Sequence, residues 1–536
     1  MESLPQFLDS LAAVDPKAEA IAWAPQEKVC RRLSWEDLVS ASRLVARRLV
    51  SLGVGKGTRV GLLCSNRIEW LPIAFGVLRT GAVLVPISTL WKRDEIAYGL
   101  IHADVSLLLT LPRFLRHDYL AAIREILGDA ERDLAGPIHS ESAPCLRRVF
   151  TVGEAAEGCP HLDDVAPAVD DSFLDSLEGS VTPTDLALVF FTSGTTSQAK
   201  AVVHTHAALT ISARRLAPCF GVGPEDAWWG HMPLFWTGGF ALGAMTTLAG
   251  RGRIVLHEVV TPESALELLA TERCTIMAGW HQAGPLLAHP GFDRSRIFLR
   301  KGTYHPLAQR LMGADHRAVG VFGMTETATC AAAARWDDPE ELRVGTFGVP
   351  LAGMTLRIVD SETGAEAEMS DSGEILVKGP TLMEGYYKVP RAQTFDENGF
   401  LKTGDLGYLD HRGALHFASR LKDVIKTAGV NVAAVEVEEA LDRHPAVKSA
   451  HVVGVSDPVR GENIVACVVL ASGASVDQEE LRRFCRESLA AYKVPRFVVF
   501  IHEDEVPQTG TGKIAKVALR ELASRLVGER IVAGAS

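Results

Sequence analysis

The chain has 536 residues, of which 47% are hydrophobic and 23% charged, a balance typical of a globular protein with two or three domains. Its 55 Lys and Arg residues face 66 Asp and Glu residues, and the formal net charge of −11 argues against nucleic acid as a partner. The nine cysteines include no C-x-x-C pair, which argues against a zinc site or a disulfide framework and favours a cytoplasmic location.

The first hundred residues predict neither a signal peptide nor a membrane span. The chain opens without a basic start followed by a long apolar run, so we expect no targeting segment. The most apolar early stretch, residues 71–87, carries Arg79 and is interrupted by Gly81 and Pro86. It therefore predicts a buried helix followed by a strand.

Short apolar strands alternate with amphipathic segments through the first three hundred residues, which predicts α/β layers with largely parallel sheets. The clearest strands are 59–64, 105–110 and 186–191. Residues 129–183 have weak periodicity, and we interpret them as a long surface connection.

The last third of the chain has a different pattern. Between residues 345 and 410 the strands shorten and turns multiply, which indicates a small antiparallel barrel or sheet. After about residue 420 we expect a separate small domain, with helices at 435–443 and 477–490 and strands at 448–454 and 463–471.

The most informative segment is Phe-Phe-Thr-Ser-Gly-Thr-Thr-Ser-Gln-Ala-Lys at residues 190–200, directly after an apolar strand. Backbone N–H groups, hydroxyls and an ammonium in one loop are the donors that a polyphosphate needs. We therefore predict a phosphate loop that ends in Lys200, with the phosphate-binding residues Thr192, Ser193, Gly194, Thr195 and Thr196. It is not a Walker loop, because no glycine precedes Lys200 and Ala201 follows it. The alternative is a Ser/Thr-rich turn with a solvent lysine.

Glu326 is the residue that we expect to hold Mg²⁺, through one carboxylate oxygen. It lies in Val-Phe-Gly-Met-Thr-Glu-Thr (321–327), where Phe322 offers a ring to a base and Thr325 can donate to a phosphate oxygen. The alternative is a helix N-cap at Thr325 with an acid in the first turn. His204 and His206 are two residues apart and point in different directions, which disfavours a metal pair there.

Three further segments carry candidate polar residues. Asp405 follows a glycine, and its two carboxylate oxygens can accept two hydroxyl donors, although such residues usually form turns. Residues 419–431 and 506–514 carry further lysines. The alternative is a solvated charge run in the first segment and a glycine-rich turn that ends in a solvent lysine in the second.

Taken in order, these segments resemble the motifs of the adenylate-forming superfamily, which joins acyl-CoA synthetases, luciferases and peptide-synthetase adenylation domains. The phosphate loop is similar to T-S-G-[ST]-T-G-x-P-K-G, although Ser197, Ala199 and Ala201 replace Gly, Pro and Gly. The later segments resemble Y-G-x-T-E (322–326, with Phe322 for the tyrosine), T-G-D (403–405), G-R-x-[DK]-D-x-I-K-x-x-G (419–429, with Ser419 for the first glycine) and P-x-T-x-x-G-K (507–513). Residues 345–353 and 373–387 match the family's glycine-rich middle motifs, which we interpret as structural turns. Residues 66–70, 81–86 and 492–495 favour the acyl-CoA synthetase branch.

The resemblance implies a set of site residues. Beyond the phosphate loop, the implied nucleotide-binding residues are Gly302, Thr303, Phe322, Gly323, Thr325, Asp405 and Arg420. The implied catalytic residues are Lys513, Lys200, Glu326, Thr325 and Lys426, with Lys422 as a hinge and Gly429 in the CoA channel.

The resemblance also implies the fold and the reaction. We expect an AMP- and acyl-binding domain at 1–421, with layered α/β sheets plus a small β-barrel, and a small mobile α+β domain at 422–536 with the lysine motif. ATP and a carboxylic acid would give an acyl adenylate, which CoA then attacks, with Mg²⁺ as the metal. No carrier-protein domain follows in this sequence, so free CoA is the expected thiol. The sequence is compatible with a homo-oligomer and does not specify the oligomeric state.

The expected acyl pocket includes bulky residues where the family has smaller ones. Trp236 stands where many relatives have His, and it is followed by Thr237, Gly238 and Gly239. Trp280 and His281 replace a V-P-T segment. Our hypothesis is a bulky or cyclic carboxylic acid as substrate. The alternative is ordinary core packing of the two tryptophans.

The altered phosphate loop suggests a second function. Fewer glycines change the freedom of the loop backbone and add Cβ atoms beside the phosphates. The chain would then perform only thioester formation, from an acyl adenylate supplied by a partner enzyme. A luciferase-like oxygenase and a non-catalytic nucleotide- or acyl-binding regulator are further alternatives.

Overall fold

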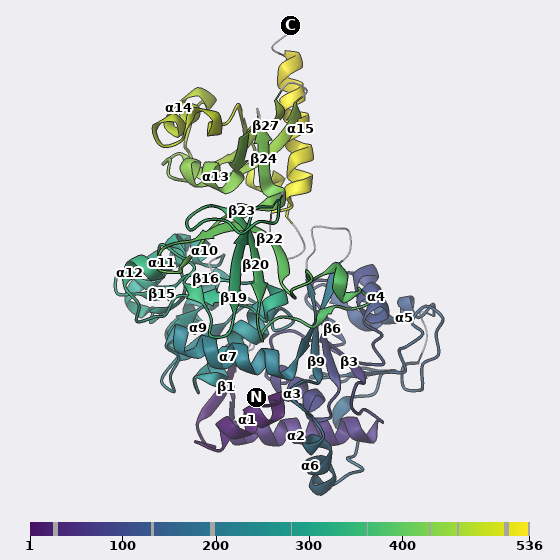
Figure 1. The fold of residues 1–536 in the computed structure, drawn as a ribbon. Helices are drawn as coiled ribbons and strands as arrows, with labels where there is room; N and C mark the ends of the chain where they lie inside the picture. Colours follow the sequence, from purple (N-terminus) through teal and green to yellow (C-terminus); the bar gives the residue numbers. More distant parts are fainter. Residues whose placement is uncertain are drawn as a thin grey trace. The chain divides into compact units, whose positions relative to one another are not determined.

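The computed structural model describes the chain apart from residues 25–29, 130–132, 193–198, 280, 362, 428–429, 458–459, 509–513 and 534–536. Lys422, Asn431 and residues 529–533 are described by their backbone alone. The chain forms two compact units, one of residues 1–356, 377–401 and 413–415 and one of residues 357–376, 402–412 and 416–536 (Figure 1). The predicted boundary after residue 421 stays a prediction. Among the described residues, no helix is both long and apolar enough to cross a membrane.

The first unit is built on two seven-stranded sheets, which confirms the predicted α/β class. One sheet has the order β15-β14-β13-β11-β12-β1-β2, and only its edge pair β1–β2 is antiparallel. In sheet order its strands are Arg317–Val319, Lys301–Thr303, Ile276–Met277, Ala227–Gly230, Arg253–His257, Glu19–Ala24 and Arg31–Ser34.

The other sheet has the order β21-β10-β9-β4-β3-β5-β8. Its strands are Gly385–Tyr386, Lys200–Thr205, Leu186–Thr192, Val83–Pro86, Arg59–Leu63, Leu107–Thr110 and Arg148–Thr151. The strands from β9 to β8 are parallel, and β4 and β5 are buried at every position. Their unbroken apolar sequences follow from this, because helices or loops cover both faces of a parallel sheet.

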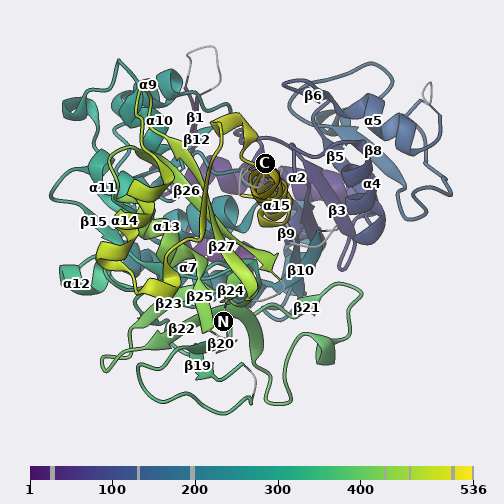
Figure 2. The same cartoon turned by 90° about the horizontal axis from the view of Figure 1, so that it is seen from above.

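Helices cover the two sheets of the first unit. They are α1 (Leu4–Ala12), α2 (Trp35–Ser51), α3 (Trp70–Arg79), α4 (Arg93–His102), α5 (Tyr119–Ile126), α6 (Asp171–Gly179), α7 (His206–Phe220), α8 (Thr246–Ala249), α9 (Pro262–Thr271), α10 (Ala283–Ala288), α11 (Pro306–Met312) and α12 (Glu340–Arg343). The helices α9, α10 and α11 bury apolar residues against β11, β12 and β13 in one cluster. Figure 2 shows α4 and α5 beside β3 and β5, at the other side of this unit.

The segment interpreted as a long surface connection is more ordered than the sequence indicates. It contains β8, the short helix η1 (Leu162–Asp164) and α6. The strand β8 pairs in parallel with β5 and completes one edge of its sheet. The interpretation of residues 129–183 as a mere connection is therefore wrong. The sequence does not reveal β8 because a strand of four residues shows little periodicity.

Shorter strands follow in the turn-rich region. The strands β16 (Val321–Phe322), β17 (Ala332–Ala333) and β18 (Val349–Pro350) form a small antiparallel sheet. A four-stranded sheet of order β19-β20-β22-β23 belongs largely to the second unit, with strands Thr355–Val359, Gly373–Lys378, Leu401–Leu409 and Leu415–Arg420. A two-stranded ribbon joins β6 (Arg113–Phe114) to β7 (His117–Asp118).

The second unit has its own core around the sheet β25-β24-β27-β26, with β28 paired to β27. Its strands are Val430–Ala433, Val424–Thr427, Gly461–Leu470, Val447–Asp457 and Phe497–Phe500. The helices α13 (Ala434–Asp442) and α14 (Gln478–Ser488) bury residues on one face, and α15 (Lys516–Ala533) does so on the other. The predicted helices and strands of this domain are thus confirmed to within a few residues.

Arg79 ties four helices of the first unit together. It ends α3 and its side chain is 0% exposed. Its Nε donates to Ser42 Oγ on α2 at 2.9 Å, and its two Nη atoms donate to Asp9 on α1 and to Glu178 on α6. A buried guanidinium is tolerated here because both acidic partners are within hydrogen-bond distance.

We expect Arg79→Ala to destabilise the first unit by about 3–5 kcal/mol, because Asp9, Ser42 and Glu178 would all lose this buried partner and Glu178 would keep only the more distant Arg43, at 3.5 Å. The measurement is urea unfolding followed by tryptophan fluorescence, since all nine tryptophans lie in the first unit. Arg113→Ala is the control, because the Arg113–Asp118 ion pair is exposed and should contribute less than about 1 kcal/mol. Equal losses in the two variants would contradict this account.

His206 predicts how stability depends on pH. Its Nδ1 accepts a hydrogen bond from Leu4 N at 3.2 Å, and burial lowers its pKa from the ordinary 6.5 to about 4. Between these values the unfolded chain binds a proton that the folded chain does not, so stability falls as pH drops. From pH 7.5 to 5.5 this histidine should remove about 1.3 kcal/mol of unfolding free energy.

The pH effect of His206 is isolated by comparing wild type with His206→Gln at the two pH values by urea unfolding. The variant should lose about 1.3 kcal/mol less than wild type on acidification. His139→Gln, at an exposed position, is the control and should lose the same unfolding free energy as wild type between the two pH values. A His206→Gln variant that also behaves like wild type would show that His206 is not held neutral.

Candidate active site

Strand β10 places the end of the predicted phosphate loop in the sheet. Lys200 lies opposite Thr192 in the antiparallel pair of β10 with β9, and Val202 lies opposite Tyr386 in the pair with β21. Thr192 and Lys200 therefore face each other at the base of the loop. The loop residues Ser193, Gly194, Thr195 and Thr196 lie outside the described residues.

Thr325 is held from two sides by residues of other motifs. His204, on β10, has its Nε2 at 2.7 Å from the Thr325 carbonyl oxygen. Burial lowers the pKa of His204 to about 4, so the ring is neutral and donates through Nε2. The hydroxyl of Thr237 lies 3.1 Å from the hydroxyl of Thr325. The predicted acyl segment and the predicted nucleotide segment therefore meet at Thr325.

Glu326 and Lys200 both contact Tyr386. The Tyr386 hydroxyl donates to Glu326 Oε1 at 2.7 Å, and Met383 N donates to the Glu326 carbonyl at 2.8 Å. The Lys200 ammonium lies 4.5 Å from the centroid of the Tyr386 ring. Burial raises the pKa of Tyr386, so its hydroxyl stays protonated and remains a donor.

The Thr325–Thr327 segment is the short helix η4, and it starts after Met324. Thr325 is thus the first residue of this turn and not its cap. Among the described residues, no cluster of three or more His, Cys, Asp or Glu side chains could hold a metal ion. A single carboxylate fits Mg²⁺ that is bound mostly through substrate phosphates and water, and Glu326 has one oxygen beyond the one that Tyr386 engages.

Two predicted glycines are required by close backbone contacts. A Cβ on Gly323 would lie 1.7 Å from the Thr329 carbonyl oxygen, and one on Gly302 would lie 1.8 Å from that of Met277. Gly302 also has a φ of +146°, which side chains rarely adopt. Thr303, which follows Gly302, accepts a hydrogen bond at its Oγ1 from Gly279 N at 2.8 Å. Phe322 is only 5% exposed, so little of its ring is open for stacking in this structure.

The predicted acyl segment begins a π-helix, η2 (Gly238–Met245), which directly follows Trp236 and Thr237. A Cβ on Gly239 would lie 2.0 Å from the Pro233 carbonyl oxygen, so only glycine allows this approach. Phe240 packs between Trp70 of α3 and Phe190 of β9, with ring centroids 5.4 and 6.2 Å away. A π-helix of this kind is rare and often occurs at functional sites.

Asn66 fixes the chain before the acyl segment. Its amide nitrogen donates to the carbonyl oxygens of Gly230 and Met232, and its oxygen accepts from Leu234 N at 2.8 Å. His281 is exposed, and its ring lies 5.5 Å from that of buried His231. Trp280, which is predicted to line the acyl pocket together with His281, lies outside the described residues.

The second unit carries the later candidates. Arg420 Nε lies 3.2 Å from Asp405 Oδ1, and the Asp405 side chain is buried. Lys426 is exposed on β24, and its backbone N–H donates to Glu462 Oε2 at 2.8 Å. The side chain of Lys422 is not described, and Gly429 and Lys513 lie outside the described residues.

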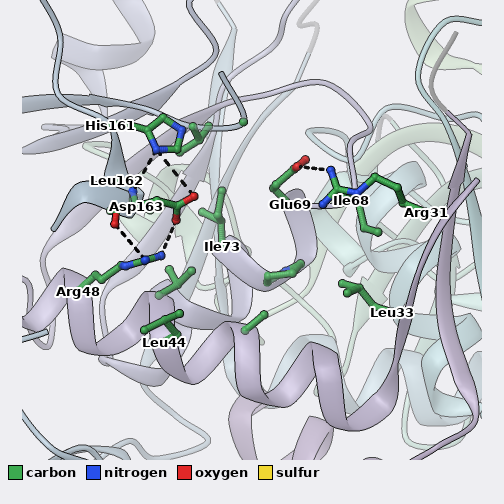
Figure 3. Close-up of a pocket in the computed structure, with 15 residues that line it drawn as sticks. Arg31, Leu33, Leu44, Arg48, Ile68, Glu69, Ile73, His161, Leu162 and Asp163 are labelled. Carbon is green, nitrogen blue, oxygen red and sulfur yellow. Dashed lines mark hydrogen bonds and ion pairs between the residues drawn. The ribbon is translucent and has the colours of Figure 1, made fainter. Parts of the chain in front are cut away.

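A cavity of about 230 Å³ lies elsewhere in the first unit, between β2, α2, the start of α3 and η1 (Figure 3). Figure 3 shows apolar side chains such as Leu44 and Ile73 between two ion pairs, Arg31–Glu69 and Arg48–Asp163. None of the predicted site residues is among the described residues that line it. The cavity is therefore separate from the site that the motifs predict.

Sequence reasoning missed three residues that organise the site: His204, Tyr386 and Asn66. The sequence pattern of His204 and His206 raises only the question of a metal pair, and Tyr386 lies in a segment whose glycines indicate structural turns. Asn66 stood in a segment read only as a mark of the family branch. A polar residue inside an otherwise apolar strand, such as His204 in β10, is the signal that would have pointed to a buried hydrogen bond.

Comparison with known proteins agrees with these motifs. The family model of the AMP-binding enzyme matches residues 8–387, and that of the AMP-binding enzyme C-terminal domain matches residues 436–513. The 2-succinylbenzoate–CoA ligase of Bacillus cereus is 30% identical over 536 residues, which cover 98% of this chain and 100% of that protein.

Solved structures give the same result. ATP-bound MatB from Rhodopseudomonas palustris superposes with a TM-score of 0.79 at 28% identity, over 97% of this chain and 99% of that one. The amide bond synthetase McbA from Marinactinospora thermotolerans gives a TM-score of 0.78 at 28% identity, over 97% of this chain and 100% of that one. The predicted fold, with a large N-terminal and a small C-terminal domain, is confirmed. The chain belongs to the AMP-binding enzyme family, in the acyl-CoA ligase branch of the adenylate-forming superfamily.

Proposed function

We propose that this enzyme uses ATP to activate a bulky or cyclic carboxylic acid as an acyl adenylate and then transfers the acyl group to CoA. The observation that carries the proposal is the meeting of three separate motifs at Thr325 and Glu326. Strand β10 supplies His204 and Lys200, the acyl segment supplies Thr237, and β21 supplies Tyr386. Hydroxyls, a carboxylate and an ammonium at one place suit a triphosphate and its counter-ion.

In the first half-reaction, a carboxylate oxygen of the acid bonds to the α-phosphorus of ATP while the bond to the bridging oxygen breaks and pyrophosphate leaves. Lys200 and Thr325 would contact the phosphates, and Glu326 would hold Mg²⁺, which would neutralise phosphate charge. Lys513 would stabilise charge that develops on the α-phosphate, as the family resemblance implies. Asp405 would accept the ribose hydroxyls, with Arg420 as its neighbour.

In the second half-reaction, the sulfur of CoA attacks the acyl carbonyl carbon, AMP leaves and the thiol loses its proton. We propose that the C-terminal domain, 422–536, rotates about Lys422 between the two steps and that Gly429 then lines the CoA channel. Lys426 would be a catalytic residue in this rotated conformation. Such closure lets one site serve two reactions. We also propose a cytoplasmic location, in keeping with the cysteine pattern.

We infer the shape of the acid from the residues around the start of η2, in the predicted acyl pocket. Trp236 is half-buried directly before η2, and its ring lies 5.4 Å from that of Phe235 in an edge-on arrangement. An indole at this position fills space and suits an acid with a flat or cyclic body. Space remains beside Gly238, because a Cβ at this position would meet only the flexible Met232 side chain, at 3.4 Å.

The function is tested with purified protein and a panel of acids, in separate assays for each half-reaction. We expect pyrophosphate release from ATP that depends on the acid, and thioester formation from synthetic acyl adenylate and CoA. Thioester formation without pyrophosphate release would reject adenylation and support supply of the adenylate by a partner enzyme. Pyrophosphate release without thioester, but with amide formed from an added amine, would reject CoA as the acceptor. Activity in neither assay would support a non-catalytic binder.

Trp236→Ala tests the acyl pocket. If Trp236 lines the pocket, the variant should lower kcat/KM for the preferred acid about tenfold or more and raise it for larger acids, with the KM for ATP unchanged. The measurement is the ranking of the acid panel for wild type and variant. Trp336→Ala, a half-buried tryptophan under the Lys301 ammonium, is the control and should keep the ranking. An unchanged ranking in Trp236→Ala, or a preference of wild type for acetate or straight fatty chains, would contradict the bulky-acid hypothesis.

A further inference from the structure

We propose that Tyr386 is a positioning residue for adenylation, which orients the Glu326 carboxylate towards the metal and keeps it apart from Lys200. This inference rests on the proposed function. Nothing in the sequence motif marks the tyrosine as more than part of a turn, and the assignment comes from its contacts in the structure.

Tyr386 is itself firmly placed. The strand β21 pairs with β10 through Val202–Tyr386 and Val203–Gly385, and Glu384 N and Tyr387 N donate to the carbonyls of Val203 and Ala201 at 2.8 Å each. Its ring packs against an apolar cluster that includes Val202 and Met383. The hydroxyl therefore reaches Glu326 from a fixed backbone, so the direction of its hydrogen bond is set by the sheet.

The hydrogen bond leaves Glu326 with one engaged and one available oxygen. Tyr386 donates to Oε1 at 2.7 Å, which leaves Oε2 for the metal. Hydrogen-bond partners of a metal-binding carboxylate fix its orientation, and losing one typically lowers metal affinity by 10–100-fold. Tyr386 can thus act on the metal without touching it.

Tyr386 also separates two opposite charges. The Lys200 ammonium lies over one part of the ring at 4.5 Å from its centroid, while the hydroxyl engages Glu326. No ion pair between Lys200 and Glu326 occurs in the part of the chain that the structure describes. A direct pair would neutralise both groups, whereas a cation over an aromatic ring stays available for a phosphate, which binds it more strongly. The ring therefore keeps the ammonium for the nucleotide and the carboxylate for the metal.

The experiment compares Tyr386→Phe with Tyr387→Phe in the full-length enzyme. The control is matched, because the Tyr387 hydroxyl also donates to a carboxylate, that of Asp104, at 2.7 Å. Each variant loses one phenol hydroxyl and keeps its ring. Binding of Mn²⁺ in the presence of a non-hydrolysable ATP analogue is measured from the electron paramagnetic resonance signal of free Mn²⁺. Thioester formation from synthetic acyl adenylate, which involves no triphosphate, is measured alongside.

We expect Tyr386→Phe to weaken Mn²⁺ binding tenfold or more and to raise the Mg²⁺ concentration for half-maximal pyrophosphate release by a similar factor. Thioester formation from acyl adenylate should stay within twofold of wild type, and Tyr387→Phe should stay within twofold in every assay. A second variant, Tyr386→Leu, removes the ring as well and should additionally raise the KM for ATP, because Lys200 and Glu326 can then pair.

Three results would overturn the inference. These are Mn²⁺ binding by Tyr386→Phe within twofold of wild type, equal effects of the two Phe variants, and an equal fall of both half-reactions in Tyr386→Phe. Failure of the proposed function is distinguishable from these. Wild-type enzyme that binds Mn²⁺ and the ATP analogue but releases no pyrophosphate with any acid would reject the function, while the tenfold binding difference would still support the role of Tyr386.

Discussion

The arrangement of the candidate site depends on the antiparallel strand β10 and its two neighbours. In a sheet whose other strands from β9 to β8 are parallel, β10 reverses direction and so returns the chain from the phosphate loop past the start of β9. Its pairing places Lys200 at the base of the loop and His204 beside Thr325. Because β21 adds to its other edge, Tyr386 is brought to Lys200, almost two hundred residues away in the sequence, and to Glu326, 60 residues away.

The polar contacts at this strand are buried or partly buried, apart from those of the exposed Lys200. His204 is fully buried and neutral, so its hydrogen bond to the Thr325 carbonyl is not replaced by water. Glycines at positions 302 and 323 allow backbone segments to approach more closely than any side chain would permit. The position of Thr325 and Glu326 is thus determined by backbone geometry and by a few hydrogen bonds, with little freedom left to the side chains.

Much of the fold was predictable because its signals are local. The parallel strands β3, β4 and β5 are apolar at nearly every position, and the helices of the second unit have clear amphipathic patterns. The strand β8 was missed because four residues carry too little periodicity. The motif segments could also be recognised from the sequence, in the order that the family has them, and the roles of their residues stay predictions. The pairing of Tyr386 with Glu326 was not, because it depends on the register of two short strands that no local pattern specifies.

The central claim is that β10 assembles residues of three motifs into one nucleotide site. Hydrogen exchange measured by mass spectrometry, with and without Mg²⁺ and a non-hydrolysable ATP analogue, tests it most directly. The account predicts that the nucleotide slows exchange together in peptides covering 190–206, 320–330 and 380–390, and leaves the cavity residues 161–163 unchanged. Protection at 161–163 without protection along β10 would contradict it.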